Sequence, residues 1–230
     1  MKENEKNVLK FLKDLNRDYS DSITNISKTG ENNNFVENEK TMISLDDVAK
    51  DFSKENFNEE LSSVDGLYHK IKEDRLILYF FEFKKMDFIA DNLLAKEKLK
   101  EIIEKIENCS LNEDCEYDYI NELKKIKKNI YNKLPIQLKI KPLESLIILH
   151  NLYEKEDGKH EDIVNIEKHY YIVSQTPNEH SPYTKNKSKT RRKGKSKEIF
   201  DFLNKLYPFP FKQTKSIPEK SFLEIISSED

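Results

Sequence analysis

Two side chains of opposite charge stand at the end of an apolar stretch. Glu82 and Lys84 follow six consecutive apolar or aromatic residues, 76–81. If this stretch is a β-strand, its period of two points Glu82 and Lys84 to one face and the neighbouring phenylalanines to the other. Asp65 precedes a second run of β-branched and aromatic residues, so a hairpin of the two runs would bring it opposite this pair. The sequence therefore predicts two carboxylates and an ammonium group at one point.

This arrangement indicates a particular chemistry. Two adjacent carboxylates repel each other unless a divalent cation lies between them, and carboxylate oxygen atoms suit Mg²⁺ or Mn²⁺. Such a cation lowers the pKa of a water molecule, which a lysine beside it can orient or help to deprotonate. We therefore predict Asp65, Glu82 and Lys84 as catalytic residues that hydrolyse a phosphodiester, with Asp65 and Glu82 as metal ligands. The alternative is a surface pair of Glu82 with Lys84, worth a few tenths of a kcal/mol, but a solvated strand would alternate polar residues along its length.

These residues resemble the signature of the PD-(D/E)XK nuclease superfamily. The resemblance covers roughly residues 60–175 and includes uncharacterised small proteins of that superfamily. Its motifs here are Asp65, with Val64 in place of the proline, then Phe80-Phe81-Glu82-Phe83-Lys84, and Lys141-Pro142-Leu143-Glu144-Ser145. It implies an α/β (α+β) fold of the restriction-endonuclease-like type, in which helices flank a mixed central sheet. It also implies a nuclease that uses Mg²⁺ or Mn²⁺.

The resemblance adds further candidate residues. The helix before the hairpin often supplies another acidic ligand in such folds, which makes Glu59 or Glu60 a candidate, and we predict Glu60 as the third metal ligand. The alternative, which the residues themselves favour, is that both belong to a solvated helix face. Lys141 and Ser145 open a helix predicted from Pro142 to Tyr153, where the positive end of the helix dipole favours a bound phosphate. The alternative is that Glu144 only caps this helix and Lys141 is solvated.

Several elements must position these residues. Apolar spacing predicts a short helix from Glu5 to Asn16, and a Ser-x-x-Asp capping box at Ser44 predicts another. The polar stretch from Tyr19 to about Thr41 predicts a linker or mobile loop. A hairpin over residues 64–84, broken at Glu73-Asp74, and a strand from His169 to Gln175 belong to a sheet of about four strands. His69 shares the strand face of Asp65 and is a peripheral candidate.

The predicted domain organisation has four parts. Residues 1–43 form a helix and linker, and residues 44–180 form the nuclease-like core, with a helical hairpin inserted at about 92–134. A basic loop follows at 181–197. Residues 198–230 form a helix and a closing segment, in which the aromatic residues of 207–211 are expected to close the core.

The basic loop indicates a partner. Eight cations fall within the thirteen residues 185–197, among them Lys189, Arg191, Arg192 and Lys193. Such a run repels itself and suits nucleic-acid phosphates. Taken alone, it can equally be a solvated loop.

Composition sets the remaining limits. The chain has 230 residues, a net charge of −3 and two cysteines, whose spacing fits no zinc or redox motif. No run of eighteen apolar residues and no signal peptide are found, so we expect a soluble cytoplasmic protein without membrane contact. The predicted function is a divalent-metal-dependent nuclease. The alternative is an inactive nuclease-like fold that binds nucleic acid or protein, and the sequence leaves the oligomeric state open, a homodimer included.

Overall fold

The computed structural model describes residues 1–28, 35–56, 61–84, 137–174, 206 and 209–228. The chain divides into two compact units, Met1–Lys85 with Lys139–Asp230 and Met86–Leu138. All described residues except 137 and 138 belong to the first unit. The helical hairpin predicted at about 92–134, the basic loop, the two cysteines, Glu59 and Glu60 lie outside the described residues. So does the predicted helix from Glu198 to Leu206, apart from its last residue.

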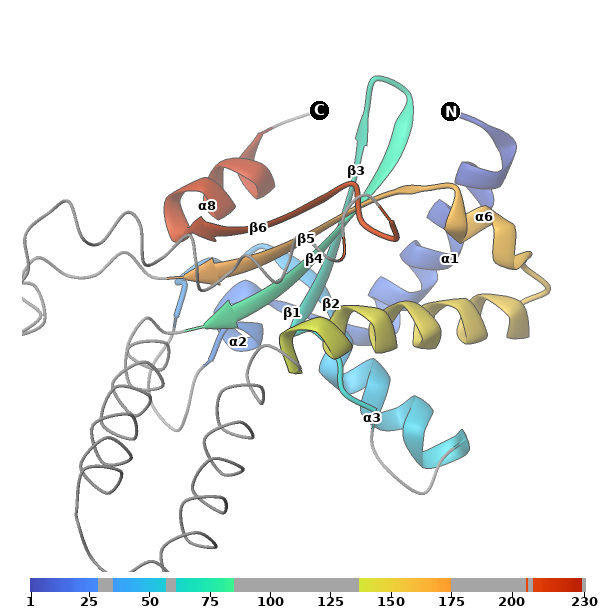
Figure 1. Cartoon of the computed structure of the whole chain (residues 1–230), viewed down its shortest axis with the longest axis horizontal. Helices are drawn as coiled ribbons and strands as arrows, with labels where there is room; N and C mark the ends of the chain where they lie inside the picture. Colours follow the sequence, from blue (N-terminus) through green and yellow to red (C-terminus); the bar gives the residue numbers. More distant parts are fainter. Residues whose placement is uncertain (29–34, 57–60, 85–136, 175–205, 207–208, 229–230) are drawn as a thin grey trace, which may run out of the picture. The chain divides into compact units, whose positions relative to one another are not determined.

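A six-stranded mixed sheet forms the centre of this unit (Figure 1). Its strands lie side by side in chain order: β1 (Ser20–Ser22), β2 (Thr41–Ser44), β3 (Gly66–Lys72), β4 (Arg75–Lys84), β5 (Glu167–Ser174) and β6 (Gln213–Pro218). The pairs β1–β2, β2–β3 and β3–β4 are antiparallel, whereas β4–β5 and β5–β6 are parallel. Helices flank the sheet, so the fold is mixed α/β, as predicted, with six strands where about four were expected.

The predicted hairpin is present as β3 and β4. Glu73 and Asp74 form its turn with φ values of 49° and 59°, the left-handed conformation that a two-residue hairpin turn requires. Gly66 lies opposite Phe81 in the register of the two strands. Asp65 therefore lies immediately before the paired part of β3, next to the end of β4.

The alternation along β4 separates two faces of the sheet. Phe81 and Phe83 pack on Phe222 of helix α8 (Glu219–Ser227), with ring centroids 4.8 and 5.2 Å apart. Glu82 points to the opposite face and contacts Lys141, on a helix whose described residues are 137–155 (yellow in Figure 1). A buried strand therefore carries a carboxylate between two phenylalanines of the core.

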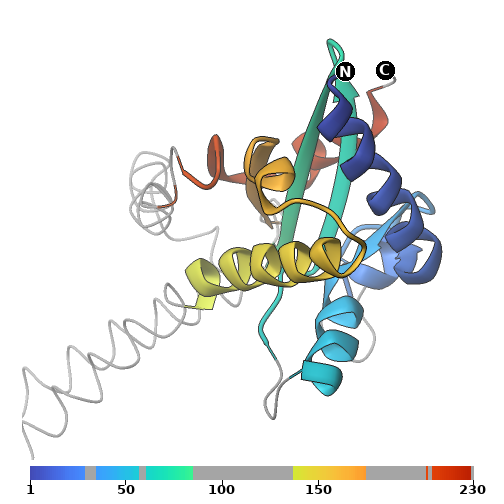
Figure 2. The same cartoon turned by 90° about the vertical axis from the view of Figure 1, so that its right-hand side faces the viewer.

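The remaining helices pack around these layers. They are α1 (Glu3–Tyr19), α2 (Ile23–Ile26), α3 (Leu45–Asn56) and α6 (His160–Val164). Phe11 of α1 packs on Tyr153 of the helix 137–155, with ring centroids 5.2 Å apart. Figure 2 shows the first turn of α1 beside the tip of the hairpin, where the Met1 amino group lies 3.9 Å from Asp74 Oδ1. The predicted helices at Glu5–Asn16 and after Ser44 are thus present, and no described helix is long and apolar enough to cross a membrane.

The prediction of a mobile linker from Tyr19 to about Thr41 is wrong for its described residues. This stretch contains β1 and α2, and its apolar residues Ile23, Phe35 and Val36 are buried, while Ile26 is partly buried against the same core. The polar residues of β1 pair through the backbone with β2 at the sheet edge. A polar composition therefore concealed an edge strand, because edge strands bond through main-chain groups and need few apolar side chains.

The C-terminal segment closes the core in part. Phe211 is fully buried, and its ring centroid lies 5.4 Å from that of Phe80 and 5.9 Å from that of Tyr170. Phe209, in contrast, is 71% exposed. The prediction that these aromatic residues close the core therefore holds for Phe211 and not for Phe209. The strand β6, which was not predicted, pairs with β5.

Candidate functional site

The hairpin brings Asp65 to the end of β4 and fixes it there. The backbone N–H of Phe83 donates a hydrogen bond of 2.6 Å to Asp65 Oδ2. On the other side, the N–H of Leu45 at the start of α3 donates to the carbonyl oxygen of Asp65 at 3.3 Å. Asp65 is therefore held by two neighbouring elements, at its carboxylate by β4 and at its main-chain carbonyl by α3.

Glu82 is fully buried and contacts two ammonium groups. Lys84 Nζ lies 2.6 Å from Glu82 Oε1. Lys141 Nζ lies 2.9 Å from Oε1 and 3.1 Å from Oε2 of the same carboxylate, and 3.6 Å from Asp65 Oδ1. The structure thus brings together four of the residues singled out in the sequence, with the Lys141 ammonium between the two carboxylates.

The electrostatics of the site follow from this burial. Burial first, and then the charge of Glu82, raises the pKa of Asp65 to about 8, while Lys141 and Lys84 oppose the shift. Burial acts to lower the pKa of Lys141, but the carboxylates of Glu82 and Asp65 outweigh it and raise that pKa overall. Lys141 therefore stays charged, and near neutral pH Asp65 keeps a proton until another cation compensates its charge.

Asp46 is a member of the site that the sequence reasoning missed. It lies in the first turn of α3 and accepts a hydrogen bond from Ser63 Oγ. Partial burial raises its pKa, and the charges of Lys141 and Glu82 also act on it. The predicted Ser44 cap contained the signal, since Ser44 bonds to Asp47 and leaves the adjacent Asp46 to face the start of the hairpin.

The helix 137–155 is hydrogen-bonded to the segment that leads into Asp65. Ser145 Oγ accepts a hydrogen bond of 3.0 Å from the Val64 N–H and donates one of 2.8 Å to the carbonyl oxygen of Lys141. Glu144 accepts a bond of 2.7 Å from the N–H of Ser62. These bonds fix the position of Asp65 relative to Lys141.

The predicted helix start at Pro142, from which the phosphate site of Lys141 and Ser145 was argued, is wrong. Residues 137–141 are already helical, so Pro142 lies inside the helix and Lys141 and Ser145 do not stand at a helix start. Ser145 is fully buried and both functions of its hydroxyl are used within the protein. Proline lacks the N–H that an interior helical position uses, and this is why it was taken for a first residue.

The remaining candidates are placed elsewhere. His69 lies on β3 opposite Leu78, three residue pairs from the Gly66–Phe81 pair that closes the site end of the hairpin. The cations Lys189, Arg191, Arg192 and Lys193 lie outside the described residues, as does Glu60.

The fit of a divalent cation depends on Asp65 and Glu82. Among the described residues, no group of three or more His, Cys, Asp or Glu side chains is placed to hold a metal ion. Magnesium in phosphoryl-transfer sites uses one or two carboxylates and completes its shell with water and substrate phosphates. The fully buried carboxylate of Glu82 and the partly buried carboxyl group of Asp65, whose pKa is raised, fit such an ion in type and number.

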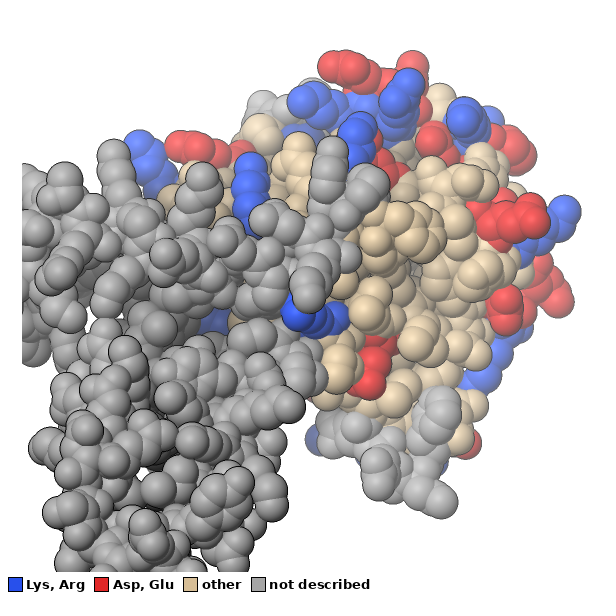
Figure 3. Space-filling view, in the orientation of Figure 1, with Lys and Arg blue, Asp and Glu red and all other residues tan. Residues whose placement is uncertain are grey.

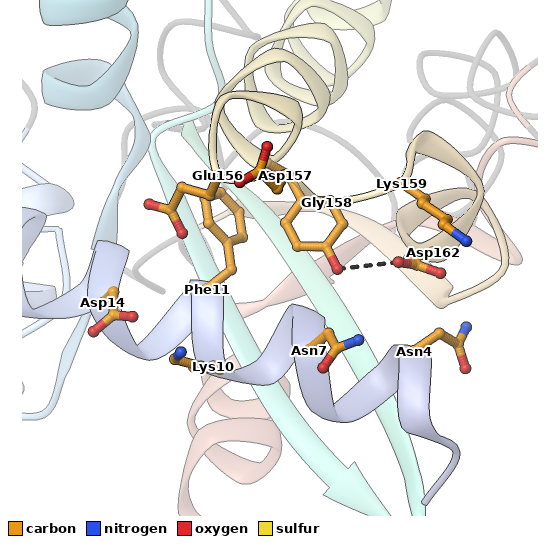
Figure 4. A pocket seen from close by; sticks show the side chains of 11 residues that line it. Asn4, Asn7, Lys10, Phe11, Asp14, Glu156, Asp157, Gly158, Lys159 and Asp162 are labelled. Carbon is orange, nitrogen blue, oxygen red and sulfur yellow. Dashed lines mark hydrogen bonds between the residues drawn. The ribbon is translucent and has the colours of Figure 1, made fainter.

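A separate cleft of about 460 Å³ lies between α1 and the segment that follows the helix 137–155 (Figure 4). Its lining is mainly polar and includes Asn4, Asn7, Lys10 and Asp162. Within it, the hydroxyl of Tyr153 donates a hydrogen bond of 3.1 Å to Asp162 Oδ2. The carboxylate and lysine residues at the end of β4 do not line this cleft.

Comparison with known proteins adds no relative: no family model, curated protein or solved structure matches this chain. The class of protein that can be stated is a mixed α/β fold with helices flanking a six-stranded sheet.

Proposed function

We propose that this chain is a divalent-metal-dependent nuclease that hydrolyses the phosphodiester bonds of nucleic acid. The observation that carries the proposal is the buried group at the end of β4, where Asp65 and Glu82 share the Lys141 ammonium and Lys84 contacts Glu82. Buried charge is expensive and occurs mainly where it is paired or functional. An ion pair needed only for stability would not require two carboxylates and two lysines at one point.

The topology is compatible with a restriction-endonuclease-like fold. An antiparallel hairpin carries Asp65 and Glu82, and a helix then leads to β5, which lies parallel to β4. Helices cover both faces of the sheet. This arrangement supports the fold that the motif implies, and the fold remains part of the proposal.

The side chains divide the work of hydrolysis between them. Asp65 and Glu82 would hold one Mg²⁺ or Mn²⁺ ion, which would act as a Lewis acid and lower the pKa of a water molecule. Asp65 needs no reorientation, because the Phe83 N–H already fixes it. Lys141, whose pKa is raised, stays protonated and is suited to stabilise negative charge on phosphate rather than to accept a proton. Lys84 is placed against Glu82 to orient the attacking water.

The test is a cleavage assay with isosteric variants. Wild-type protein is incubated with single- and double-stranded DNA and RNA in Mg²⁺, Mn²⁺ or EDTA. Glu82→Gln and Asp65→Asn should each lower cleavage by at least about 100-fold with an unchanged circular-dichroism spectrum. Glu224→Gln, an exposed change on α8, should leave it unaffected. Wild-type protein that cleaves none of these substrates would contradict the proposal.

Nucleic acid is the proposed partner because of the basic run 185–197. Lysines and arginines without a fixed frame contact phosphates as point charges and read no bases. If six of its eight cations touch phosphate, the logarithm of affinity should fall with the logarithm of salt concentration with a slope of about −4 to −5. Replacing Lys189, Arg191, Arg192 and Lys193 by glutamine should flatten that slope and weaken all sequences alike. An unchanged slope would exclude this role.

A second candidate function is a catalytically inactive module that binds a partner protein or nucleic acid. The observation that favours it is an apolar stripe on the helix 137–155, where Ile140, Leu143 and Ile147 are 39%, 37% and 50% exposed. The space-filling view also shows a broad area without charged side chains, bordered by charged residues (Figure 3).

Calorimetric titration of Mn²⁺ separates the two functions. Heat of binding that disappears in Asp65→Asn supports the enzyme. Absence of heat in the wild-type protein, titrated both with and without an oligonucleotide, supports the inactive module, in which Lys141 and Lys84 compensate the carboxylates.

A further inference from the structure

Tyr170 on β5 carries a buried hydroxyl group without a partner. The residue is fully buried, and among the described residues its hydroxyl oxygen has no hydrogen-bond partner. An unsatisfied buried hydroxyl destabilises a protein, and phenylalanine would fill the same space without that penalty. The position therefore calls for a reason other than packing.

The pairing of β4 with β5 places Tyr170 beside the candidate site. Tyr170 lies opposite Phe80 and Ile172 lies opposite Glu82 in the parallel register. Because side chains alternate between faces with a period of two, Tyr170 and Glu82 share one face of the sheet on neighbouring strands. Phe211 packs against both Phe80 and Tyr170, so the ring has a fixed neighbour within the core.

The carboxylates act on this hydroxyl through space. Burial first, and then the charges of Glu82 and Asp65, raises the pKa of Tyr170 well above its ordinary value. The hydroxyl therefore keeps its proton near neutral pH, where it can donate a hydrogen bond. Glu82 and Asp65 are the charged acceptors that act on this hydroxyl.

We propose that Tyr170 is a positioning residue, whose hydroxyl group holds a water molecule against the Glu82 carboxylate. The tyrosine donates to the water and the water donates to Glu82, which satisfies the buried hydroxyl and gives the site a water in a fixed orientation. The placement of this water rests on the unpaired Tyr170 hydroxyl and on the register of β4 and β5. Its part in hydrolysis rests on the proposed nuclease function.

The adjacent residue offers a matched control. Tyr171 points to the opposite face, where its hydroxyl donates to Gln213 Oε1 at 2.7 Å and lies 3.1 Å from His169 Nδ1. Tyr171→Phe removes a satisfied hydroxyl far from Glu82. Tyr170→Phe removes one that meets only the proposed water.

The experiment combines high-resolution crystal structures with kinetics of the full chain. The wild-type structure should contain a water within hydrogen-bond distance of Tyr170 Oη and Glu82, and the Tyr170→Phe structure should lack it. Tyr170→Phe should lower kcat by about tenfold to 100-fold with little change in KM, whereas Tyr171→Phe should lower Tm and leave kcat unchanged.

The outcomes separate this inference from the proposed function. A wild-type structure without the water, or an unchanged kcat in Tyr170→Phe while Glu82→Gln abolishes cleavage, overturns the role of Tyr170 and leaves the nuclease standing. A water bound as described in a protein that cleaves no nucleic acid supports its placement and refutes the nuclease.

Discussion

Replacing Asp65 by asparagine should stabilise the folded protein increasingly as the pH rises. In the folded state the pKa of Asp65 is raised from 3.8 to about 8, by burial and then by Glu82. A group whose folded pKa lies above its unfolded pKa contributes stability that is fully present below the unfolded value and is lost as the pH rises through the folded value. Asparagine stays neutral, keeps an oxygen acceptor for the Phe83 N–H, and loses nothing over that range.

The magnitude follows from the width of the window. Each pH unit between the two pKa values corresponds to about 1.4 kcal/mol of differential proton binding. The free energy of unfolding of Asp65→Asn minus that of the wild type should therefore widen by about 2 to 3 kcal/mol between pH 5 and pH 7. Above about pH 8 the difference should level off, since the folded carboxyl has then ionised.

Urea denaturation followed by circular dichroism measures this difference at pH 5, 6, 7 and 9, with EDTA present to remove divalent cations. Asp51→Asn is the control: Asp51 is exposed, and its hydrogen bond from Lys54 lowers its pKa. Its contribution therefore changes below pH 4, and no widening is expected between pH 5 and pH 7. A difference between Asp65→Asn and the wild type that is independent of pH would refute the charge conflict deduced for the site.

Two further changes test the elements that position Asp65. Glu73→Asn with Asp74→Gly should raise the free energy of unfolding by about 1 kcal/mol, because both positions have a left-handed backbone that asparagine and glycine adopt more readily. Urea denaturation that shows no gain in stability would contradict this. Ser145→Ala should lower it by about 1 to 3 kcal/mol, since the Val64 N–H loses its buried acceptor. Equal stability of Ser145→Ala and the exposed Ser227→Ala would show that this bond is dispensable.

The hairpin and the faces of β4 were predictable because their signal is local. Six apolar residues before Glu82 and two acidic residues at the break specify two strands and a turn, and the period of two then assigns Glu82 and Lys84 to one face. The meeting of Asp65 with this pair follows from closing a hairpin with a two-residue turn. No long-range information is needed for these steps.

The partners of Glu82 from other elements could not be predicted in the same way. Lys141 is 59 residues away in sequence, and its role was assigned through Pro142 to a helix start that does not exist. Proline marks a first helical turn in many sequences, but the pattern cannot tell this from a proline inside a longer helix. Asp46 was missed because its neighbour Asp47 explained the capping motif, and one acidic residue in a first turn looks like another.

The balance of charge in the site indicates the order in which a nuclease of this kind would assemble. Lys141 and Lys84 compensate Glu82, and the raised pKa of Asp65 keeps that carboxyl group protonated near neutral pH, so few carboxylates are uncompensated before a cation binds. Affinity for a hard divalent cation rises with the number of uncompensated carboxylates, so this site should hold Mg²⁺ weakly on its own. A phosphate group would add negative charge and oxygen ligands for the cation. It would also give Lys141 a partner once the carboxylates held the cation. On the proposed function, metal and nucleic acid therefore bind cooperatively, and Lys141 keeps the empty site neutral enough to remain folded.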